Sequence, residues 1–202
     1  MKVNLSNNEK EEDLFLKAIL TKCLKKDETA QNMLFQLFYG YAKSICLRYS
    51  SSQEDAKDIL MKGFMKVFQN LEKYAFERPF KAWLRTILVN TAHTYYRDQK
   101  KFENEISLEN QPEIENSESI INALSAEELL ALIQKLTPAY RSVFVMYAVD
   151  GYTHHEISEI LNINEGTSKS NYMKARLKLQ GFIQKINPDL FYQYSTSKTK
   201  SI

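Results

Sequence analysis

Residues 151–183 read GYTHHEISEILNINEGTSKSNYMKARLKLQGFI and predict a short helix, a tight turn and a longer, basic helix. Thr153 is a good N-cap, and Glu156 three residues later completes a capping box. Asn162 tolerates the left-handed backbone conformation in which many helices end. The second helix has two candidate caps, Asn164 and Thr167. This layout is typical of a helix-turn-helix, whose second helix enters the DNA major groove by its N-terminal end.

The second helix of this motif begins with small hydroxyl-bearing side chains and continues with basic ones. Hydroxyl groups and the positive end of the helix dipole favour phosphate oxygens at a helix start. Arg176 is the best candidate for a base or phosphate contact, because arginine reads guanine with two hydrogen bonds. A solvated amphipathic face is the alternative for any single basic residue. The predicted contacts to duplex DNA are Thr167, Ser168, Lys169, Ser170, Asn171, Lys174 and Arg176.

Composition narrows the class of protein. A chain of 202 residues forms one or two small domains, and its low content of 5 Gly and 4 Pro favours helices over strands. The two cysteines, Cys23 and Cys46, are too few for a disulfide framework, and neither they nor the 3 histidines have the spacing of metal ligands. No catalytic constellation or phosphate-binding glycine loop is present. We therefore expect no enzyme, no metal, no cofactor and no small-molecule substrate.

The N-terminal residues MKVNLSNNEKEEDLF contain no apolar segment of the kind that a signal peptide requires. No stretch of the chain has the length of apolar residues that a membrane span needs. These two features predict a cytoplasmic protein without membrane insertion.

Charge is distributed in three blocks. Residues 1–101 carry 18 Lys and Arg against 12 Asp and Glu, and residues 135–202 carry 9 against 5. Residues 102–134, between them, carry 8 acidic residues and no basic ones. Two basic blocks around an acidic connector are typical of two nucleic-acid-binding modules joined by a linker. Chance variation among solvated faces is the alternative interpretation of the same pattern.

Apolar periodicity predicts four helices before the connector and four shorter helices after it. The first four are expected at about 13–26, 33–49, 53–71 and 80–100. Ser125 with Glu128 forms a capping box for the fifth helix, and Thr137–Pro138 starts the sixth. The expected fold is all-α, with two small helical domains at 13–101 and 125–186. The remaining expected segments are a disordered N-terminus at 1–12, an acidic flexible linker at 102–124 and a flexible tail at 187–202.

Three segments carry further information through their order and spacing. They are Glu54–Tyr74 (EDAKDILMKGFMKVFQNLEKY), Pro79–Lys101 (PFKAWLRTILVNTAHTYYRDQKK) and Leu136–Gln180, which includes the helix-turn-helix. Together they resemble the extracytoplasmic-function (ECF) sigma factors, bacterial transcription initiation factors of the sigma-70 family. The resemblance implies a sigma region 2 domain and a sigma region 4 domain without an active site, which bind core RNA polymerase and direct it to promoters.

By this resemblance, the helix at Glu54–Tyr74 docks on the coiled-coil helices of the polymerase clamp. Its acidic pair meets basic residues of the partner, and its apolar positions complete the contact. As an alternative, the acids lie in a solvated first turn, where the helix dipole favours negative charge. The alternative for the apolar residues is that they only pack in the core. Family members often carry Gln-Glu where this chain has Met61–Lys62. The residues implied for polymerase binding are Asp55, Asp58, Phe64 and Val67.

The resemblance also implies that the loop before the fourth helix captures a base flipped from the melted promoter, while that helix reads the neighbouring positions. Aromatic side chains stack on bases, and Lys and Arg follow phosphates. Trp83 matches the family as well, but its spacing favours the core over a base-stacking role. The implied contacts to melted promoter DNA are Lys73, Tyr74, Arg78, Lys81, Arg85, Asn90 and Arg97. Which of the adjacent Tyr95 and Tyr96 lies inward is left open.

The expected function is therefore an ECF-type sigma factor with core RNA polymerase and promoter DNA as partners. An anti-sigma factor is a further expected partner, because many relatives are held inactive by one. Two alternatives are a stand-alone helix-turn-helix regulator that needs no polymerase, and a helical interaction protein with degenerate DNA contacts. The acidic linker either imitates nucleic acid inside the polymerase, as in related factors, or is a solvated spacer.

Overall fold

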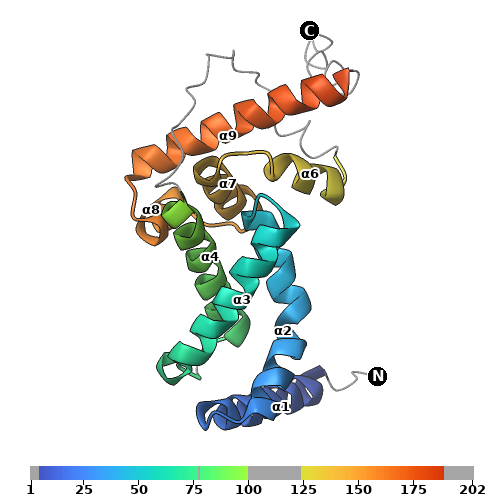
Figure 1. Cartoon of the computed structure of the whole chain (residues 1–202), viewed down its shortest axis with the longest axis vertical. Coiled ribbons are helices and arrows are strands. Elements are labelled where there is room, and N and C mark those ends of the chain that lie inside the picture. The colour runs from blue at the N-terminus through green and yellow to red at the C-terminus, as the bar shows by residue number, and fades with distance from the viewer. Residues whose placement is uncertain (1–4, 77, 100–123, 189–202) are drawn as a thin grey trace. The chain divides into compact units, whose positions relative to one another are not determined.

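The computed structural model describes residues 5–76, 78–99 and 124–188, and every regular element in these ranges is a helix (Figure 1). The predicted all-α class is therefore confirmed. Almost all of the predicted linker at 102–124, and the tail from residue 189 onward, lie outside the described residues. The chain divides into two compact units, residues 1–46 with 57–91 and residues 47–56 with 92–202. We call them the first and the second unit.

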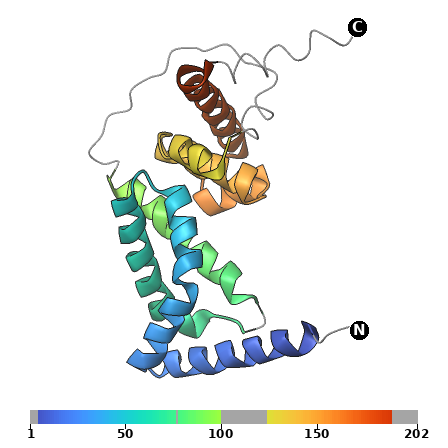
Figure 2. The ribbon, with the colours of Figure 1, turned by 90° about the vertical axis from the view of Figure 1, so that its right-hand side faces the viewer.

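Four long helices form most of the first unit: α1 (Leu5–Leu24), α2 (Glu28–Tyr49), α3 (Gln53–Asn70) and α4 (Phe80–Gln99). The end of α2 and the start of α3, within 47–56, and the end of α4, at 92–99, belong to the second unit. A short 3-10 helix, η1 (Leu71–Lys73), follows α3. In Figure 2, α1 lies crosswise to α2, and it packs against η1. Helix α1 begins at Leu5 and not near Asp13, so residues 5–12 are helical where disorder was predicted. Glu and Lys in this segment favour helix.

Aromatic and aliphatic side chains hold α2, α3 and α4 together. The ring centroids of Phe35 on α2 and Phe64 on α3 lie 4.8 Å apart in an edge-to-face arrangement, which aromatic pairs prefer. Gly63 lets α3 approach α4 closely, because a Cβ atom there would lie 2.5 Å from Leu88 Cδ2. Leu88 is fully buried, so its side chain has little room to move away. The spacing between α3 and α4 therefore depends on this one glycine.

The second unit contains the helices after the linker. They are α6 (Ala126–Ile133), α7 (Pro138–Phe144), the π-helical turn η3 (Val145–Val149), α8 (His154–Leu161) and α9 (Glu165–Ile186). Figure 1 shows α9 lying along α6, α7 and α8, and it contacts all three. The prediction of shorter helices fails for α9, which has 22 residues, as many as α2. Helix α9 is long because its apolar stripe continues to Ile183, which is buried.

Local capping in the second unit follows the sequence. Both predicted capping boxes form, Ser125 with Glu128 and Thr153 with Glu156. Asn162 ends α8 in the left-handed conformation, with a φ of 52°. The choice left open for α9 is settled by the side chain of Asn164, which accepts a hydrogen bond of 2.8 Å from the backbone N–H of Gly166. These contacts join atoms only two or three residues apart, so they need no tertiary partner.

Arg141 is the main buried cation of the second unit, with 1% of its surface exposed. Its guanidinium donates to the carbonyl oxygens of Ile133, Gln134 and Leu136, at 3.2, 3.0 and 2.6 Å. It also donates to the carbonyl oxygen of Tyr49 and to Ser51 Oγ, at 3.3 and 2.8 Å. A buried guanidinium is tolerated only when its donors are satisfied, and these bonds fix the turn between α6 and α7.

No helix in the described part of the chain combines the length and the apolar character needed to cross a membrane.

Candidate nucleic-acid interface

Helix α3 turns the two predicted apolar contact residues inward. Phe64 is 2% exposed and Val67 is fully buried, so both belong to the core of the first unit. This corrects their assignment to a polymerase contact, because a side chain without exposed surface cannot meet a partner. The outward face of α3 instead carries Asp58, Met61 and Met65, which are all exposed. Met61 is 50% exposed and Met65 is 59% exposed. Family matching places a residue on the helix, but the neighbouring helices decide which face is covered.

Asp55 already has two partners inside the second unit. Its carboxylate accepts hydrogen bonds from the hydroxyls of Tyr95 and Tyr96, at 3.0 and 2.8 Å. The Tyr96 hydroxyl also accepts a bond of 2.6 Å from the backbone N–H of Ser51. The structure thus settles the question of the tyrosine pair: Tyr96 is buried, Tyr95 is half-buried, and both meet Asp55. Of the predicted acidic pair, Asp58 is the more exposed member.

A hollow of about 310 Å³ lies between α3 and α4 in the first unit. Lys73 and Asn90, two of the residues predicted to contact melted DNA, both line it. Its lining also includes Trp83, which is half-buried. The helical spacing of Trp83 favoured a place in the closed core, and that prediction is wrong. The complete lining is Lys66, Asn70, Lys73, Trp83, Ile87, Asn90 and Thr91.

Sequence reasoning missed Lys66, Asn70 and Ile87, although a signal for them exists. Lys66, Asn70 and Lys73 are spaced at i, i+4 and i+7, and so are Trp83, Ile87 and Asn90. The first set runs from α3 into η1 and the second along α4, and the two sets line opposite sides of the hollow. Lys73 Nζ donates to Asn70 Oδ1 at 3.1 Å, which orients this wall. An aromatic ring, amides and ammonium groups in one concavity suit a nucleobase and its phosphates.

Tyr74 packs inside the loop that precedes α4. It is 7% exposed, and its ring centroid lies 5.1 Å from that of Trp83 and 5.5 Å from that of Phe80. Its hydroxyl donates to the carbonyl oxygen of Arg78, and burial raises its pKa above the ordinary value. Tyr74 therefore supports the loop and offers no open face to a base. The exposed aromatic residue of the loop is Phe76, which the sequence analysis overlooked.

The other cations predicted to contact melted DNA stay at the surface of their helices. Arg78 and Lys81 are exposed beside the loop, and Arg85 is half-buried on α4. Arg97 is exposed near the end of α4, within the second unit, where its Nε lies 3.7 Å from Asp98 Oδ1. These four cations do not line the hollow.

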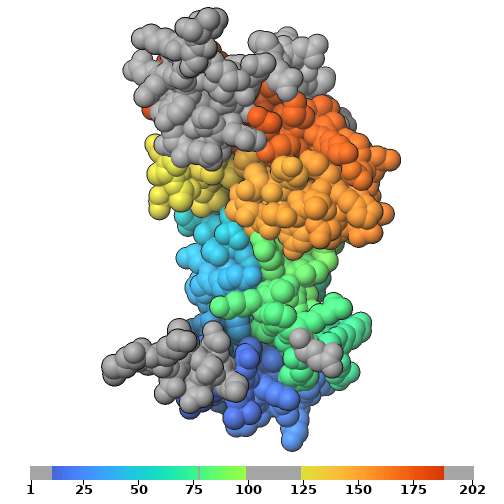
Figure 3. Space-filling model, turned by 180° about the vertical axis from the view of Figure 1, so that it is seen from behind, coloured from blue at the N-terminus to red at the C-terminus, as the bar shows by residue number. Residues whose placement is uncertain are grey.

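The recognition helix α9 divides its predicted contact residues between two sides. Thr167, Lys169, Ser170 and Lys174 are exposed, while Asn171 and Arg176 are half-buried. Ser168 is fully buried, so it leaves the set of residues that can reach DNA. The carbon at the centre of the Arg176 guanidinium lies 5.8 Å from the ring centroid of Tyr172, a cation–π distance. Figure 3 shows atoms of α8 and α9, in orange to red-orange, forming one exposed surface.

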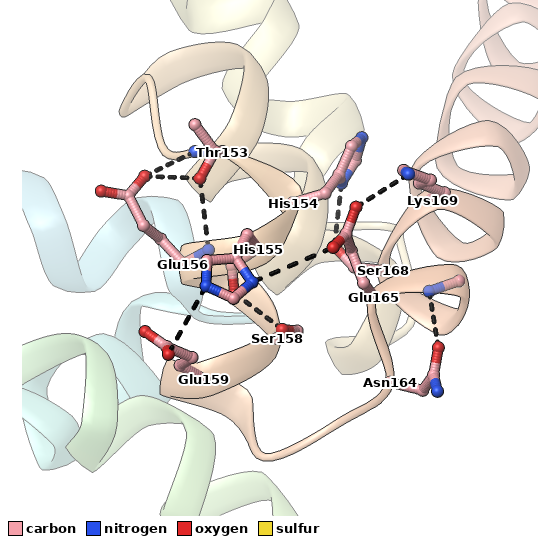
Figure 4. Close-up of polar contacts among 11 residues, drawn as sticks. Thr153, His154, His155, Glu156, Ser158, Glu159, Asn164, Glu165, Ser168 and Lys169 are labelled. Carbon is pink, nitrogen blue, oxygen red and sulfur yellow. Dashed lines mark hydrogen bonds and ion pairs between the residues drawn. The ribbon is translucent and has the colours of Figure 1, made fainter.

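Polar contacts connect α8 to the start of α9 (Figure 4). Lys169 Nζ lies 2.8 Å from Glu165 Oε1, and this bond lowers the pKa of the Glu165 carboxyl. The ring of His155 lies 3.7 Å from Glu159 on its own helix and 3.9 Å from Glu165 on α9. The only acidic residue in the first turn of α9 is thus surrounded by cationic or titratable groups.

Comparison with known families matches two segments of the chain. Residues 34–102 match the family model for Sigma-70 region 2, and residues 126–179 match the model for Sigma-70, region 4. The two matches together cover more than half of the chain and contain the hollow and the helix-turn-helix, respectively. The chain belongs to the sigma-70 family. The resemblance inferred from the sequence is therefore confirmed.

The curated relatives of this sigma factor are of the ECF type. The chain is 27% identical over 186 residues to the ECF RNA polymerase sigma-E factor of Escherichia coli K12, covering 86% of this chain and 96% of that protein. It is 25% identical over 180 residues to the ECF RNA polymerase sigma factor SigW of Bacillus subtilis, covering 83% and 96%. This chain is thus an RNA polymerase sigma factor of the ECF type.

Among solved structures, the chain matches the complex of sigma factor RpoE with the anti-sigma factor NepR from Bartonella quintana. It is 18% identical, covers 77% of this chain and 97% of that chain, and has a TM-score of 0.47. The family assignment of this sigma factor rests on the sequence matches.

Across residues 5–76, 78–99 and 124–188, no three His, Cys, Asp or Glu side chains gather in a group that could hold a metal ion. What the described surfaces offer is hydrogen bonding, stacking and positive charge, and those are the means by which proteins bind nucleic acid.

Proposed function

We propose that this ECF-type sigma factor acts in the cytoplasm by binding alone, without covalent chemistry, and that it uses two different DNA-contacting surfaces. The observation that carries the proposal is the hollow within the region 2 match and the exposed start of α9 within the region 4 match. A concave surface with an aromatic wall suits an unpaired strand. A convex helix with hydroxyl groups and lysines in its first turns suits the major groove of a duplex.

Recognition of the upstream promoter element is proposed for the exposed side of α9. Thr167 and Ser170 offer hydroxyl groups to phosphates, and Lys169 and Lys174 add positive charge. Glu165 would repel phosphates at this helix end, and its pairing with Lys169 at 2.8 Å offsets that repulsion. Asn171 and Arg176, both half-buried, are proposed as secondary contacts farther along the helix.

Capture of the melted strand is proposed for the hollow between α3 and α4. Trp83 provides the stacking face, and the amide of Asn90 can pair with the edge of a base. Lys66 and Lys73 lie on the opposite wall, where they would neutralise the phosphates on either side of that base. The cations outside the hollow would guide the strand along its backbone; these are Arg78, Lys81, Arg85 and Arg97.

Docking on core RNA polymerase is proposed for the outward face of α3, defined by Asp58, Met61 and Met65. Methionine adapts its shape to a partner surface, and an exposed carboxylate can meet a basic residue. The departure from the family at Met61–Lys62 places a thioether where an amide is usual and a cation where an anion is usual, so it changes the polarity of this contact. An anti-sigma factor is proposed as a further partner, and it would compete with polymerase for exposed faces of the sigma factor.

The experiment that tests the proposal is a pull-down of bacterial core RNA polymerase with the purified chain, followed by run-off transcription from a pool of genomic fragments. Polymerase binding together with new transcription start sites is the expected result. Met65→Asp should weaken polymerase binding about tenfold or more, because it introduces a charge into an apolar contact. Leu14→Asp is the matched control, since Leu14 is also an exposed apolar residue (70%) but lies on α1 and not on the proposed face of α3.

The possible results separate the proposal from its rivals. DNA binding without polymerase binding would favour a stand-alone regulator. Binding to polymerase without new start sites would favour an interaction protein. Equal losses for Met65→Asp and Leu14→Asp would contradict the assignment of the docking face, while leaving the family assignment intact.

A further inference from the structure

Two adjacent histidines open α8, and they point in different directions (Figure 4). The side chain of His155 is 72% exposed and lies near Glu159 and Glu165. His154 is half-buried and turned toward α9. One residue thus faces solvent, and its neighbour joins the two helices of the motif.

The joining contact is a hydrogen bond between His154 Nδ1 and Ser168 Oγ, at 2.9 Å. Ser168 is fully buried, so its hydroxyl group has no access to water. A buried hydroxyl that loses its partner bears the full cost of desolvation, so this bond ties Ser168 to α8. Ser168 lies between Thr167 and Lys169, which are both exposed on the side of α9 proposed to face DNA.

Ring stacking holds the imidazole of His154 in place. Its centroid lies 4.3 Å from that of Tyr147, with the two rings within 11° of parallel. The ring of Tyr172, on α9, meets it edge-on at 5.8 Å. Tyr172 is stacked in turn on Phe144 of α7 at 6.0 Å and 18°. Neighbours from η3 and α9 therefore hold the imidazole in place. Its hydrogen bond in turn restrains the position of Ser168.

We infer that His154 is a positioning residue for DNA reading: its bond to Ser168 sets the rotation of the first turns of α9, and so aims Thr167 and Lys169 at the upstream promoter duplex. This inference rests on the proposed function of α9. A recognition helix that rotates about its axis moves every exposed side chain together, so one internal bond can control several contacts. Neither His154 nor Ser168 touches DNA in this arrangement.

The charge state of His154 gives a readout that simple packing would not give. Burial, and then the nearby Lys169, lower the pKa of His154, while Glu165 opposes them. The other titratable groups around it are Tyr147, Tyr172 and its neighbour His155. A lowered pKa means that the folded motif keeps the ring neutral above about pH 6.5. As pH falls through the lowered pKa, protonation adds a positive charge near Lys169 and leaves Nδ1 only as a donor, so the geometry set by the neutral ring is lost.

Four substitutions distinguish the effect of the hydrogen bond to Ser168 from the effect of ring stacking by His154. His154→Phe keeps an aromatic ring for stacking but has no nitrogen. His154→Asn loses the ring but places an amide close to the position of Nδ1. Ser168→Ala removes the partner, and His155→Asn is the matched control at an exposed position of the same type. Thermal unfolding by circular dichroism identifies any variant that fails to fold.

The test uses the holoenzyme made from core RNA polymerase and the full chain, with duplexes that the wild-type holoenzyme selects from a randomised library. His154→Phe and Ser168→Ala should bind these duplexes about tenfold more weakly, which corresponds to one unsatisfied buried group. His154→Asn should recover to within about threefold of wild type. As pH falls below about 6.5 and through the lowered pKa of His154, wild type and His155→Asn should lose affinity, while His154→Asn should stay level.

Wild-type affinity in a folded His154→Phe variant would overturn the inference alone, and so would an unchanged acid loss in His154→Asn. A His154→Asn variant as weak as His154→Phe would also overturn it, because the ring and not the bond would then matter. A wild-type holoenzyme that selects no duplex would instead overturn the proposed function of α9, and the inference with it.

Discussion

The hollow between α3 and α4 and the exposed side of α9 differ in how their residues come together. The hollow combines residues from separate helices, Lys66–Lys73 on α3 and η1 and Trp83–Thr91 on α4, which meet only when these helices pack together. The start of α9 is defined within about twenty residues, by the cap of α8, the turn at Asn162 and the cap at Asn164. One surface is thus assembled by tertiary packing, and the other is largely set by local hydrogen bonds.

Local sequence therefore defines the start of α9 more completely than it defines the hollow. For the helix-turn-helix, the caps fixed the ends of the helices before any packing was known. For the hollow, the family resemblance indicated Lys73 and Asn90, whereas the spacing of Trp83 wrongly favoured the core. If the comparison is right, substitutions that alter helix packing should damage the first surface alone, and substitutions of caps should damage only the second.

The largest effect is expected from Gly63→Ala. Its Cβ would lie 2.5 Å from Leu88 Cδ2, and overpacking of this kind costs about 1–3 kcal/mol of unfolding free energy. Urea unfolding measures the loss, and binding to a fork-junction DNA with an unpaired strand should fall with it. Gly40→Ala on α2 is the matched control, because nothing lies within 4 Å of its new Cβ. That control should gain about 0.5–1 kcal/mol from better helix propensity.

Trp83→Ala should weaken binding of the unpaired strand by about 1–3 kcal/mol, the range measured for loss of one stacking platform. Binding of the upstream duplex should stay unchanged, since α9 is not altered. Fluorescence anisotropy with fork-junction and duplex probes compares the two. Trp83→Phe, which keeps an aromatic face, should lose less. Equal losses on both probes would contradict the separation of the two surfaces.

Thr153→Ala removes the N-cap of α8 and should cost about 1 kcal/mol of unfolding free energy. The side chain accepts from the backbone N–H of Glu156 at 3.2 Å, and alanine leaves that group without its partner. Thermal unfolding and duplex binding should both respond. Thr153→Ser, which keeps the hydroxyl group, should behave like wild type. Reduced binding of the unpaired strand in Thr153→Ala would count against a purely local effect.

Lys26→Gly should stabilise the first unit by a little under about 1 kcal/mol. Lys26 lies in the turn between α1 and α2 with a φ of 60°, a conformation that costs an ordinary L-residue free energy and glycine almost none. Lys25→Gly, one residue earlier, is the control and should show no gain. Chemical denaturation resolves the pair, and equal midpoints would show that the strain at Lys26 is relieved in another way.

The smallest effect is expected from pH at the capping box of α8. Hydrogen bonds from the backbone N–H and then the hydroxyl of Thr153 lower the pKa of Glu156. The stability it contributes is therefore present above its ordinary pKa and is lost as pH falls through the lowered value. In the Glu156→Gln variant, the midpoint of unfolding should therefore fall less steeply between about pH 5 and about pH 3 than it does in wild type. Glu159→Gln, outside the capping box, should not.

The sequence by itself determined the helical class, the capping boxes at Ser125 and Thr153, the turn at Asn162 and the sigma-70 family. These features depend on residue order and on atoms a few positions apart, which the printed sequence already contains. Tertiary structure decided that Phe64 and Ser168 are buried, that Asp55 binds two tyrosines and that Trp83 lines a hollow. Periodicity defines the faces of a helix, but only the helices packed against it decide which face remains open to DNA.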